Sequence, residues 1–233
     1  MSFDGYMGTV HIISDSSEPF ESREQAGEQL ARQLRKFSGR RPVVLGIPRG
    51  GIVIAYEIAA RLKADLDVIL AHKLGAPHNP ELAIGAVLED GTHFVNKMTA
   101  SYVGADQSYI RQEKAIQLDR MTHRAQQYRR VLPRLSLDGR VVVVTDDGVA
   151  TGASMQAALW AVRAQSPESI VLALPVGPDD TVRMLSKTAD ETMCLKAPPD
   201  FQALSRFYLR FEQVSDEQVL TILEQETQRR PER

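Results

Sequence analysis

The sequence predicts a doubly wound α/β domain with a mainly parallel sheet. Short apolar runs suited to buried strands alternate along the chain with segments of helical periodicity. A strand–turn–helix–strand order near the N-terminus favours parallel pairing with a right-handed crossover. The composition is that of an ordinary globular protein, with 43% hydrophobic and 25% charged residues. The 233 residues suit one such domain with a modest elaboration, or two small domains.

The charge balance and the cysteine content indicate a cytoplasmic protein without nucleic-acid or membrane partners. The formal net charge is −2, which gives no electrostatic reason for binding an anionic polymer or bilayer. Cys194 is the single cysteine, so no intramolecular disulfide is possible. The opening residues lack the basic patch and apolar core of a secretory signal, and no apolar run is long enough to span a membrane.

The first third of the chain contains the first expected strand–helix unit. Residues 1–19 have no strong period and are interpreted as an extended, loosely attached arm. Leu30, Leu34 and Phe37 recur at helical spacing, and Gly39 follows as a C-terminal cap. The expected elements are a helix over 20–37, a strand over 43–47, a helix over 52–62 and a strand over 66–71.

The middle of the chain departs from this alternation. Two strand-like runs, 81–88 and 93–95, flank Glu89-Asp90-Gly91, which is a hairpin turn signal. A long charged helix over 106–131 follows, with an apolar stripe that includes Met121 and Tyr128. We therefore expect residues 75–132 to form a hairpin-plus-helix insertion.

The last third returns to strands and helices. Ser215 is expected to cap a final helix, with Gln218 completing a capping box. The domain is expected to end at residue 223, leaving 224–233 as a tail. The other expected elements are strands over 141–144, 169–175 and 191–195 and helices over 153–164 and 179–186.

The segment from Val141 to Ser154 carries the strongest chemical signal. A buried strand delivers two adjacent carboxylates, Asp146 and Asp147, at its carboxyl end, where ligands bind in open α/β sheets. Small and hydroxylated residues follow and lead into a helix, which lets backbone N–H groups converge on an anion. Acids beside an anion cradle suit a sugar phosphate, because the acids accept hydrogen bonds from its hydroxyls. Taken alone, either the acid pair or the small residues after it would be explained more simply by an ordinary strand end followed by a surface turn. The combination of the two argues against that explanation.

This segment resembles the phosphoribosyl-diphosphate-binding motif of type I phosphoribosyltransferases. Gly46-Ile-Pro-Arg-Gly-Gly-Ile52 is similar to the pyrophosphate loop of that family. The segments 20–27, 72–85 and 201–219 resemble an uncharacterised bacterial subgroup, so the resemblance covers roughly residues 20–223. The chain has His72 where that subgroup commonly has an arginine.

The resemblance implies roles for particular residues. Asp146 and Asp147 would contact the ribose hydroxyls, directly or through Mg²⁺. Arg49 and Gly50 would meet the diphosphate. Lys73 would also contact the diphosphate, and an exposed strand-end lysine is an equally good explanation of this residue. The acid pair is not a metal site by itself, because Mg²⁺ arrives with phosphates and keeps several waters. The 5-phosphate would be held by Ala150, Thr151, Gly152, Ala153 and Ser154.

The implied reaction is transfer of a 5-phosphoribosyl group from phosphoribosyl diphosphate to a nitrogenous acceptor. Such enzymes close a loop after the second strand, so the insertion over 75–132 is expected to act as a lid or as a homodimer contact. For most of its arginines a solvated face is the simpler interpretation. The acceptor would be selected by a hood, for which residues 196–214 are the candidate. Their aromatics could stack on a base, although an aromatic core cluster is the more common explanation, and the sequence does not identify the base.

Other functional classes fit less well. A nucleotide- or phosphoribosyl-diphosphate-sensing regulator without turnover is the main alternative on the same fold. The chain has no G-x-G-x-x-G dinucleotide fingerprint and no G-x-x-x-x-G-K-[ST] loop. A receiver domain would not place Thr-Gly-Ala-Ser directly after the acid pair.

Overall fold

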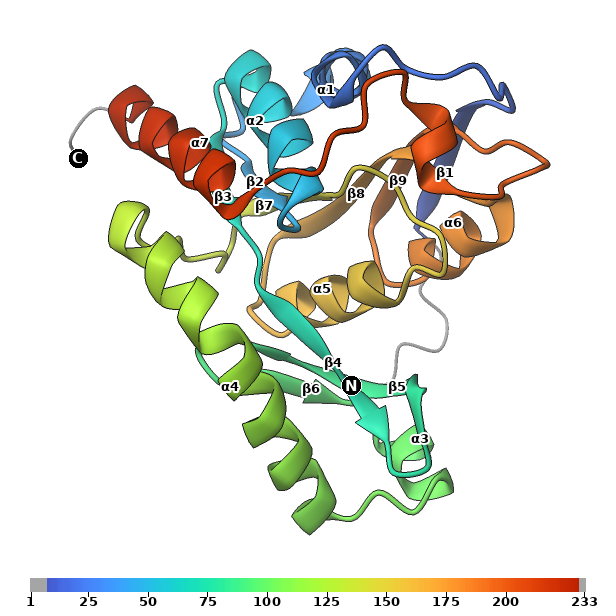
Figure 1. The fold of residues 1–233 in the computed structure, drawn as a ribbon, viewed down its shortest axis with the longest axis vertical. Coiled ribbons are helices and arrows are strands. Elements are labelled where there is room, and N and C mark those ends of the chain that lie inside the picture. The colour runs from blue at the N-terminus through green and yellow to red at the C-terminus, as the bar shows by residue number, and fades with distance from the viewer. Residues whose placement is uncertain (1–7, 231–233) are drawn as a thin grey trace.

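The computed structural model describes residues 8–230, which form a large parallel sheet covered by helices and a smaller antiparallel sheet beside it (Figure 1). The large sheet has six strands in the order β1-β9-β8-β7-β2-β3, and every neighbouring pair is parallel. The predicted doubly wound, mainly parallel architecture is therefore confirmed. Its strands are β1 (Thr9–Ser14), β2 (Val43–Gly46), β3 (Asp65–Val68), β7 (Val141–Thr145), β8 (Ser169–Val176) and β9 (Glu191–Lys196).

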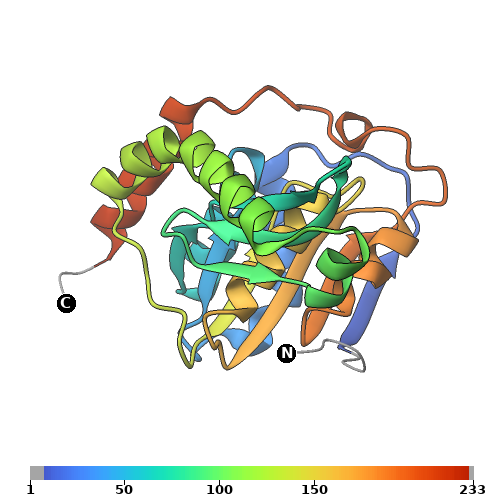
Figure 2. The same ribbon diagram turned by 90° about the horizontal axis from the view of Figure 1, so that it is seen from below.

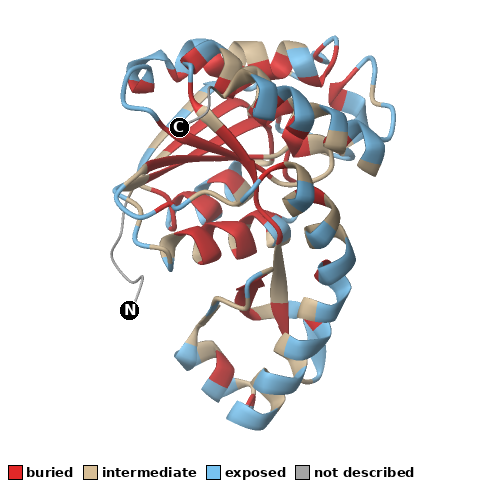
Figure 3. Ribbon diagram, turned by 90° about the vertical axis from the view of Figure 1, so that its left-hand side faces the viewer, coloured by how far each residue is buried: buried red, intermediate tan, exposed pale blue. Residues whose placement is uncertain are grey.

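Helices cover both faces of the large sheet. Two hydrophobic clusters lie on its opposite faces, and the four valines of β7 contribute alternately to one and the other. This explains why β7 is an unbroken apolar run: a central parallel strand is buried on both sides (Figure 3). One face is covered by α1 (Arg23–Gln33) and α2 (Gly50–Leu62), with α7 (Asp216–Arg229) alongside; the other by α5 (Ala153–Arg163) and α6 (Asp179–Ser186). Short 3₁₀ helices span Arg35–Phe37 and Leu204–Phe207.

The insertion forms its own small layer against α5. Its three antiparallel strands are β4 (Ala71–Ala76), β5 (Asn79–Leu88) and β6 (His93–Val95). The predicted β5–β6 hairpin is confirmed, and Gly91 adopts a positive φ of 83° in its turn. The helices α3 (Lys97–Tyr102) and α4 (Gln107–Val131) follow, and α4 runs across the molecule until its C-terminal half lies beside α7 (Figures 1 and 2). Asp106, where the long helix was expected to start, is the N-cap of α4.

Three expectations need correction. The arm interpretation is wrong for Thr9–Ser14, which form β1 and pair in parallel with β9; residues 1–7 lie outside the described residues. The single strand expected over 66–71 is two strands in different sheets, because the chain leaves the large sheet after Val68. The expected tail begins inside α7, which continues to Arg229.

The last turn of α7 closes one edge of the large sheet. Glu226 is fully buried and accepts a hydrogen bond from the Leu66 backbone N–H (3.1 Å). Its carboxylate pairs with Arg229 and Arg230, whose guanidinium groups donate to the backbone carbonyls of Ala64 and Leu66. Side chains of α7 thus satisfy backbone groups of β3 that would otherwise present an unpaired edge.

None of the helices within residues 8–230 combines the length and the apolar character needed to cross a bilayer.

We predict that Glu226→Gln lowers the free energy of unfolding by about 3 kcal/mol, because it leaves two arginines without their buried counter-charge. Urea unfolding followed by circular dichroism measures the change. Glu224→Gln is the matched control, since Glu224 is exposed on the same helix. Equal stability of the two variants would contradict a structural role for the edge closure.

Candidate functional site

The two sequence motifs that suggested a phosphate ligand lie side by side. Strands β2 and β7 are parallel neighbours, so the loops that follow them emerge at the same edge of the sheet. The Ile47 backbone N–H donates to the Thr145 carbonyl (3.0 Å), which ties the two loops together where they begin. The structure therefore brings Arg49 and Gly50 to the same region as Asp146 and Asp147.

Glycine is required where these two loops touch. A Cβ on Gly50 would lie 2.0 Å from a carboxylate oxygen of Asp147, and one on Gly51 would lie 2.8 Å from the Cα of Asp146. From the sequence alone, the role expected of the loop glycine is to let a diphosphate approach the backbone closely. The structure gives a reason inside the protein: the glycines let the N-terminus of α2 pack directly on the acid pair.

Asp147 is held by groups far away in the sequence. Arg23, from the first turn of α1, donates from Nε to Asp147 Oδ2 (2.8 Å), and both side chains are nearly buried (9% and 13% exposed). Arg23 also donates to the Glu212 carbonyl (2.9 Å), and its guanidinium lies 4.0 Å from the centre of the Phe211 ring. The Tyr208 hydroxyl donates to the Asp147 carbonyl (2.6 Å). The segment 208–212 is thereby fastened to the acid pair.

Of the two acids, Asp146 is the one whose ionisation costs more free energy. Its burial raises the pKa of the carboxyl group well above the ordinary range, and the neighbouring negative charge of Asp147 raises this pKa further. The Asp147 backbone N–H donates to Asp146 Oδ1 (2.8 Å), which partly offsets the cost. A half-buried carboxyl group that forms no ion pair within residues 8–230 is poised to gain from a ligand that brings hydroxyls or a cation.

The loop after the acid pair leads into α5 through a left-handed residue. Gly152 is the N-cap of α5 with φ of 75°, and no side chain caps this helix. Among the described residues, the first backbone N–H groups of α5, at Ala153 and Ser154, have no acceptor. Thr181 of α6 donates to the Ala150 carbonyl (3.0 Å) and supports the loop from behind. The open N–H groups at a helix N-terminus suit an anion.

A cleft of about 490 Å³ lies in front of this helix N-terminus. It unites four of the residues that the sequence singled out: Lys73, Thr151, Ala153 and Ser154. The facing wall comes from α4, which contributes Glu113, Gln117 and Arg120. Arg120 has no ion pair within residues 8–230, so its charge is available to a ligand in the cleft. Lys73 pairs with the exposed Glu81 (2.9 Å).

His72 lies in the same cleft as a neutral group. Gln117 donates its amide N–H to Glu113, so its oxygen faces His72 Nδ1 (3.1 Å) and His72 must donate there. Burial lowers the pKa of His72; the Gln117 hydrogen bond opposes this, while the charges of Arg124 and Arg120 lower the pKa further. Arg120 and Arg124 therefore lie close enough to His72 to act on its pKa, while Glu113 places a negative charge on the same wall of the cleft.

Arg49 points to a different partner from the one the sequence suggested. Its Nη1 lies 3.8 Å from the Asp216 carboxylate at the start of α7, and its side chain is 33% exposed. Asp216 also binds Arg124 and Tyr128 of α4. The pyrophosphate-like loop therefore contacts both the insertion helix and the C-terminal helix.

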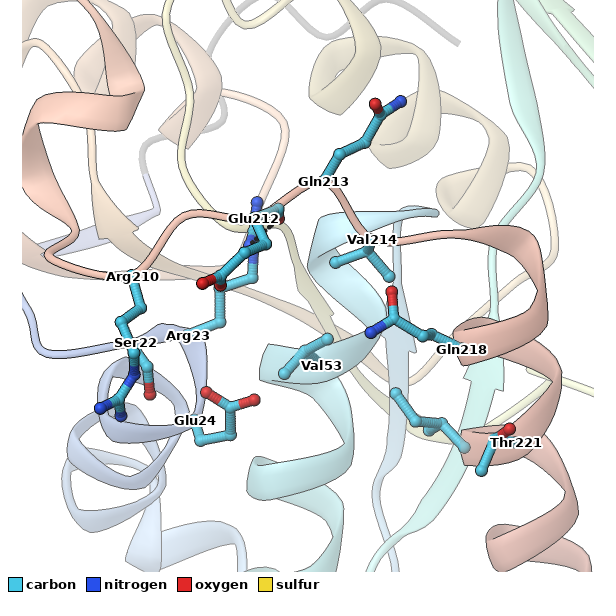
Figure 4. A pocket seen from close by; sticks show the side chains of 11 residues that line it. Ser22, Arg23, Glu24, Val53, Arg210, Glu212, Gln213, Val214, Gln218 and Thr221 are labelled. Atoms are coloured by element: carbon cyan, nitrogen blue, oxygen red, sulfur yellow. Dashed lines mark hydrogen bonds between the residues drawn. The ribbon is translucent and has the colours of Figure 1, made fainter.

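A second cavity, of about 460 Å³, lies behind the segment 210–214 (Figure 4). Arg23 lines it and separates it from Asp147, while Val53 of α2 and Gln218 of α7 form its other sides. The residues of the acid pair and of the phosphate loop do not line it. It is therefore a neighbour of the candidate site and not part of it.

The described residues do not provide a complete metal site. Groups of three or more His, Cys, Asp or Glu side chains that could hold a metal ion are absent from residues 8–230. The acid pair offers two carboxylates, and Arg23 already neutralises that of Asp147. This donor set fits a Mg²⁺ ion that brings its own ligands, such as phosphate oxygens and water, and does not fit a permanently bound ion.

Sequence reasoning missed several residues that the fold brings to the site. Arg23, Tyr208, Arg120 and Asp216 lie far from the acid pair along the chain. For Arg23 a signal existed, since it lies in the segment 20–27 that resembles the bacterial subgroup. The position of Asp216 as the first residue of a capped helix gave no indication of its arginine partners.

The parallel sheet, with an acid pair and a helix N-terminus at the carboxyl end of β7, defines an α/β protein whose candidate site lies at that edge of the sheet. A sequence profile described as the phosphoribosyl transferase domain matches residues 18–211. The chain belongs to this family.

Similar proteins agree with this assignment. Two proteins of Mycobacterium tuberculosis, from two strains, carry provisional names as phosphoribosyl transferases and are 42% identical over 205 residues. The match covers 88% of this chain and 46% of those proteins, so the chain spans about half the length of these curated relatives. The crystal structure of TT1426 from Thermus thermophilus is 47% identical, covers 89% of this chain and 98% of that chain, and superposes with a TM-score of 0.85.

We predict that Asp146→Asn stabilises the ligand-free protein at alkaline pH. The amide keeps an oxygen for the Asp147 N–H but removes a poorly solvated charge. Each unit by which the pKa is raised corresponds to about 1.4 kcal/mol. Because the folded pKa exceeds the unfolded one, wild type loses stability as pH rises from about 4 towards the folded pKa. The gain should therefore be small at pH 4 and at least ~1 kcal/mol at pH 8.

Urea unfolding at both pH values measures this gain, with Asp138→Asn, at an exposed turn, as the control. A gain that is absent at pH 8, or equal at both pH values, would contradict the electrostatic strain assigned to Asp146.

Proposed function

We propose that the protein is a Mg²⁺-dependent phosphoribosyltransferase, which transfers a 5-phosphoribosyl group from phosphoribosyl diphosphate to a nitrogenous acceptor. The observation that carries the proposal is the pairing of a strained acid pair with an open helix N-terminus at the same strand end. The acids suit ribose hydroxyls, and the helix N-terminus suits the 5-phosphate. Membership of the family supports the class of reaction.

In the proposed reaction, the bond between the anomeric carbon and the diphosphate oxygen breaks and a carbon–nitrogen bond forms. The diphosphate leaves with the electron pair, and the acceptor nitrogen loses its proton. Negative charge develops on the leaving group, so cations placed in advance are the main source of rate acceleration. Arg49 and Arg120 are the cations that the site offers, with Lys73 next to the phosphate loop.

Mg²⁺ would neutralise part of the diphosphate charge and would be held by water-mediated contacts to Asp146 and Asp147. Arg23 would keep Asp147 ionised and oriented by its direct hydrogen bond. The hood proposed for the acceptor is the segment 196–214, whose aromatic pairs Phe201–Phe207 and Tyr208–Phe211 are stacked on one another. This self-stacking favours a supporting role for these rings over direct base stacking. We place the reaction in the cytoplasm.

We predict that Gly152→Val weakens the binding of ribose 5-phosphate far more than Ser154→Ala. A Cβ on Gly152 would point at α6, 3.0 Å from Thr181 Cγ2, and the positive φ disfavours any side chain. A valine side chain would therefore distort the loop by pressing on α6 and not by filling the space in front of the helix N-terminus. Ser154→Ala removes one neutral hydrogen bond, so it should weaken binding about tenfold at most. Calorimetric titration compares them, and circular dichroism verifies folding. Binding by folded Gly152→Val at wild-type strength would place the phosphate elsewhere.

The reaction itself is tested by incubating the protein with phosphoribosyl diphosphate, Mg²⁺ and a panel of nitrogenous bases and amines. Release of diphosphate that depends on both the acceptor and Mg²⁺ is the expected result. The Asp146→Asn, Asp147→Asn double variant should release none. Tight binding of phosphoribosyl diphosphate without turnover on any acceptor would favour the regulator instead.

A further inference from the structure

Three elements of the fold meet at the carboxylate of Asp216. Arg124 of α4 places Nε 3.1 Å from Oδ1, and Arg49, from the turn before α2, places Nη1 3.8 Å from Oδ2. The Tyr128 hydroxyl, one helical turn after Arg124, donates to Oδ1. Asp216 is the first residue of α7, directly after its N-cap Ser215. A single carboxylate thus joins the pyrophosphate-like loop to the insertion helix and the C-terminal helix.

Without the Asp216 side chain, this arrangement would be an anion receptor. Two guanidinium groups and a hydroxyl converge on one place, and Arg49 and Arg124 have no other ion pair among residues 8–230. The charges sum to +1, because two arginines face one carboxylate. Both arginines remain accessible, with 33% and 41% of their side chains exposed. The receptor therefore attracts anions more highly charged than a carboxylate.

The ionisation of Asp216 agrees with this description. Burial alone would raise the pKa of Asp216, but the hydrogen bond from Tyr128 and the charges of Arg124 and Arg49 outweigh burial and lower the pKa. The carboxylate is therefore charged at neutral pH and is an effective competitor for the arginines. Tyr128 is fully buried, so its hydroxyl is a fixed donor that keeps the carboxylate in place.

We propose that Arg49 and Arg124 form a two-arginine clamp for the diphosphate group of the substrate, and that Asp216 occupies this clamp until the ligand displaces it. The inference rests on the proposed function and adds to it a binding residue on the insertion, Arg124, and a positioning residue, Asp216. A diphosphate offers more negative charge and more acceptor oxygens than one carboxylate, so it takes over both guanidinium groups. The apparent affinity for diphosphate is then reduced by the fraction of molecules in which Asp216 holds the clamp.

The test is calorimetric titration with inorganic diphosphate and, separately, with ribose 5-phosphate, both with Mg²⁺. Asp216→Asn removes the competing charge and keeps an oxygen for Tyr128, so it should bind diphosphate severalfold more tightly than wild type. Arg124→Gln should bind diphosphate about tenfold more weakly, or worse, because a charge-assisted contact is lost. Ribose 5-phosphate, which lacks the diphosphate, should bind both variants as it binds wild type.

Glu217→Gln is the matched control for net charge. It removes one negative charge from the next residue of α7, which acts on Arg49 only at a distance and makes no hydrogen bond or ion pair with either arginine of the clamp. It should leave diphosphate affinity near the wild-type value. If Asp216→Asn and Glu217→Gln tighten diphosphate binding equally, the effect comes from net charge alone and the proposal is overturned. Tyr128→Phe loosens the hold on Asp216 without altering either arginine; it should also tighten diphosphate binding, and it carries the test if Asp216→Asn does not fold.

The outcomes separate this inference from the proposed function. Unchanged or weaker diphosphate binding by Asp216→Asn, with normal ribose 5-phosphate binding, overturns the clamp and leaves the phosphoribosyl site standing. Absence of diphosphate binding by wild type overturns the clamp as well. Absence of binding by wild type for ribose 5-phosphate and phosphoribosyl diphosphate alike would remove the proposed function itself.

Discussion

The contact between two glycines and two aspartates is the constraint on which the site depends. Gly50 and Gly51 bring the N-terminus of α2 so close to Asp146 and Asp147 that a single added Cβ would collide with the acid pair. The approach is possible because β2 and β7 are parallel neighbours in register, so that their loops leave the sheet together. The packing leaves Asp146 half-buried without an ion pair among residues 8–230 and directs Asp147 to Arg23.

The cost of this contact is offset by distant parts of the chain. Arg23 neutralises Asp147 and at the same time holds the Glu212 carbonyl, while Tyr208 holds the Asp147 carbonyl. The α1 helix and the segment 208–212 are therefore attached to the acid pair by hydrogen bonds that the ligand does not provide. The charge of Asp146 has no such partner. Functional sites commonly retain an uncompensated charge of this kind, because a ligand that compensates the charge then binds more favourably.

Local signals predicted much of the fold. The capping box at Ser215, the hairpin turn at Gly91 and the start of the long helix at Asp106 are each encoded by a few adjacent residues, and the structure has all three. Strand β1 was missed because its pairing with β9 joins residues far apart in sequence, and an edge strand of this kind shows only weak alternation. The end of α7 was missed for a related reason: Glu226 resembles a surface acid until β3 is placed beside it.

The same distinction applies to the site. The acid pair and the small residues before α5 form one continuous segment and the glycine loop forms another, so each could be recognised as a candidate from its own sequence. The contacts that Arg23 and Asp216 make from other elements could not be predicted, because a charged side chain carries no local sign of its partner. Arg49 illustrates this limit. The sequence singled out Arg49 itself, but the carboxylate that pairs with Arg49 is that of Asp216 in α7, where the sequence predicted only a helix cap.

Most arginines of the insertion helix α4 were expected to be solvated. In the structure, the surroundings of these arginines differ along the helix. Arg129 is fixed between Asp67 and Glu89, which anchors the C-terminal end of α4 to β3 and to the end of β5. Arg124 lies one turn and a half earlier and binds Asp216, and Arg120 faces the cleft. Because Glu226 fixes the other end of α7 to β3, displacement of Asp216 would loosen only the first turn of α7 and the segment before it. Arg23 donates to the Glu212 carbonyl in that segment and also pairs with Asp147. A ligand that displaces Asp216 would therefore act on Asp147 through hydrogen bonds already present in the protein.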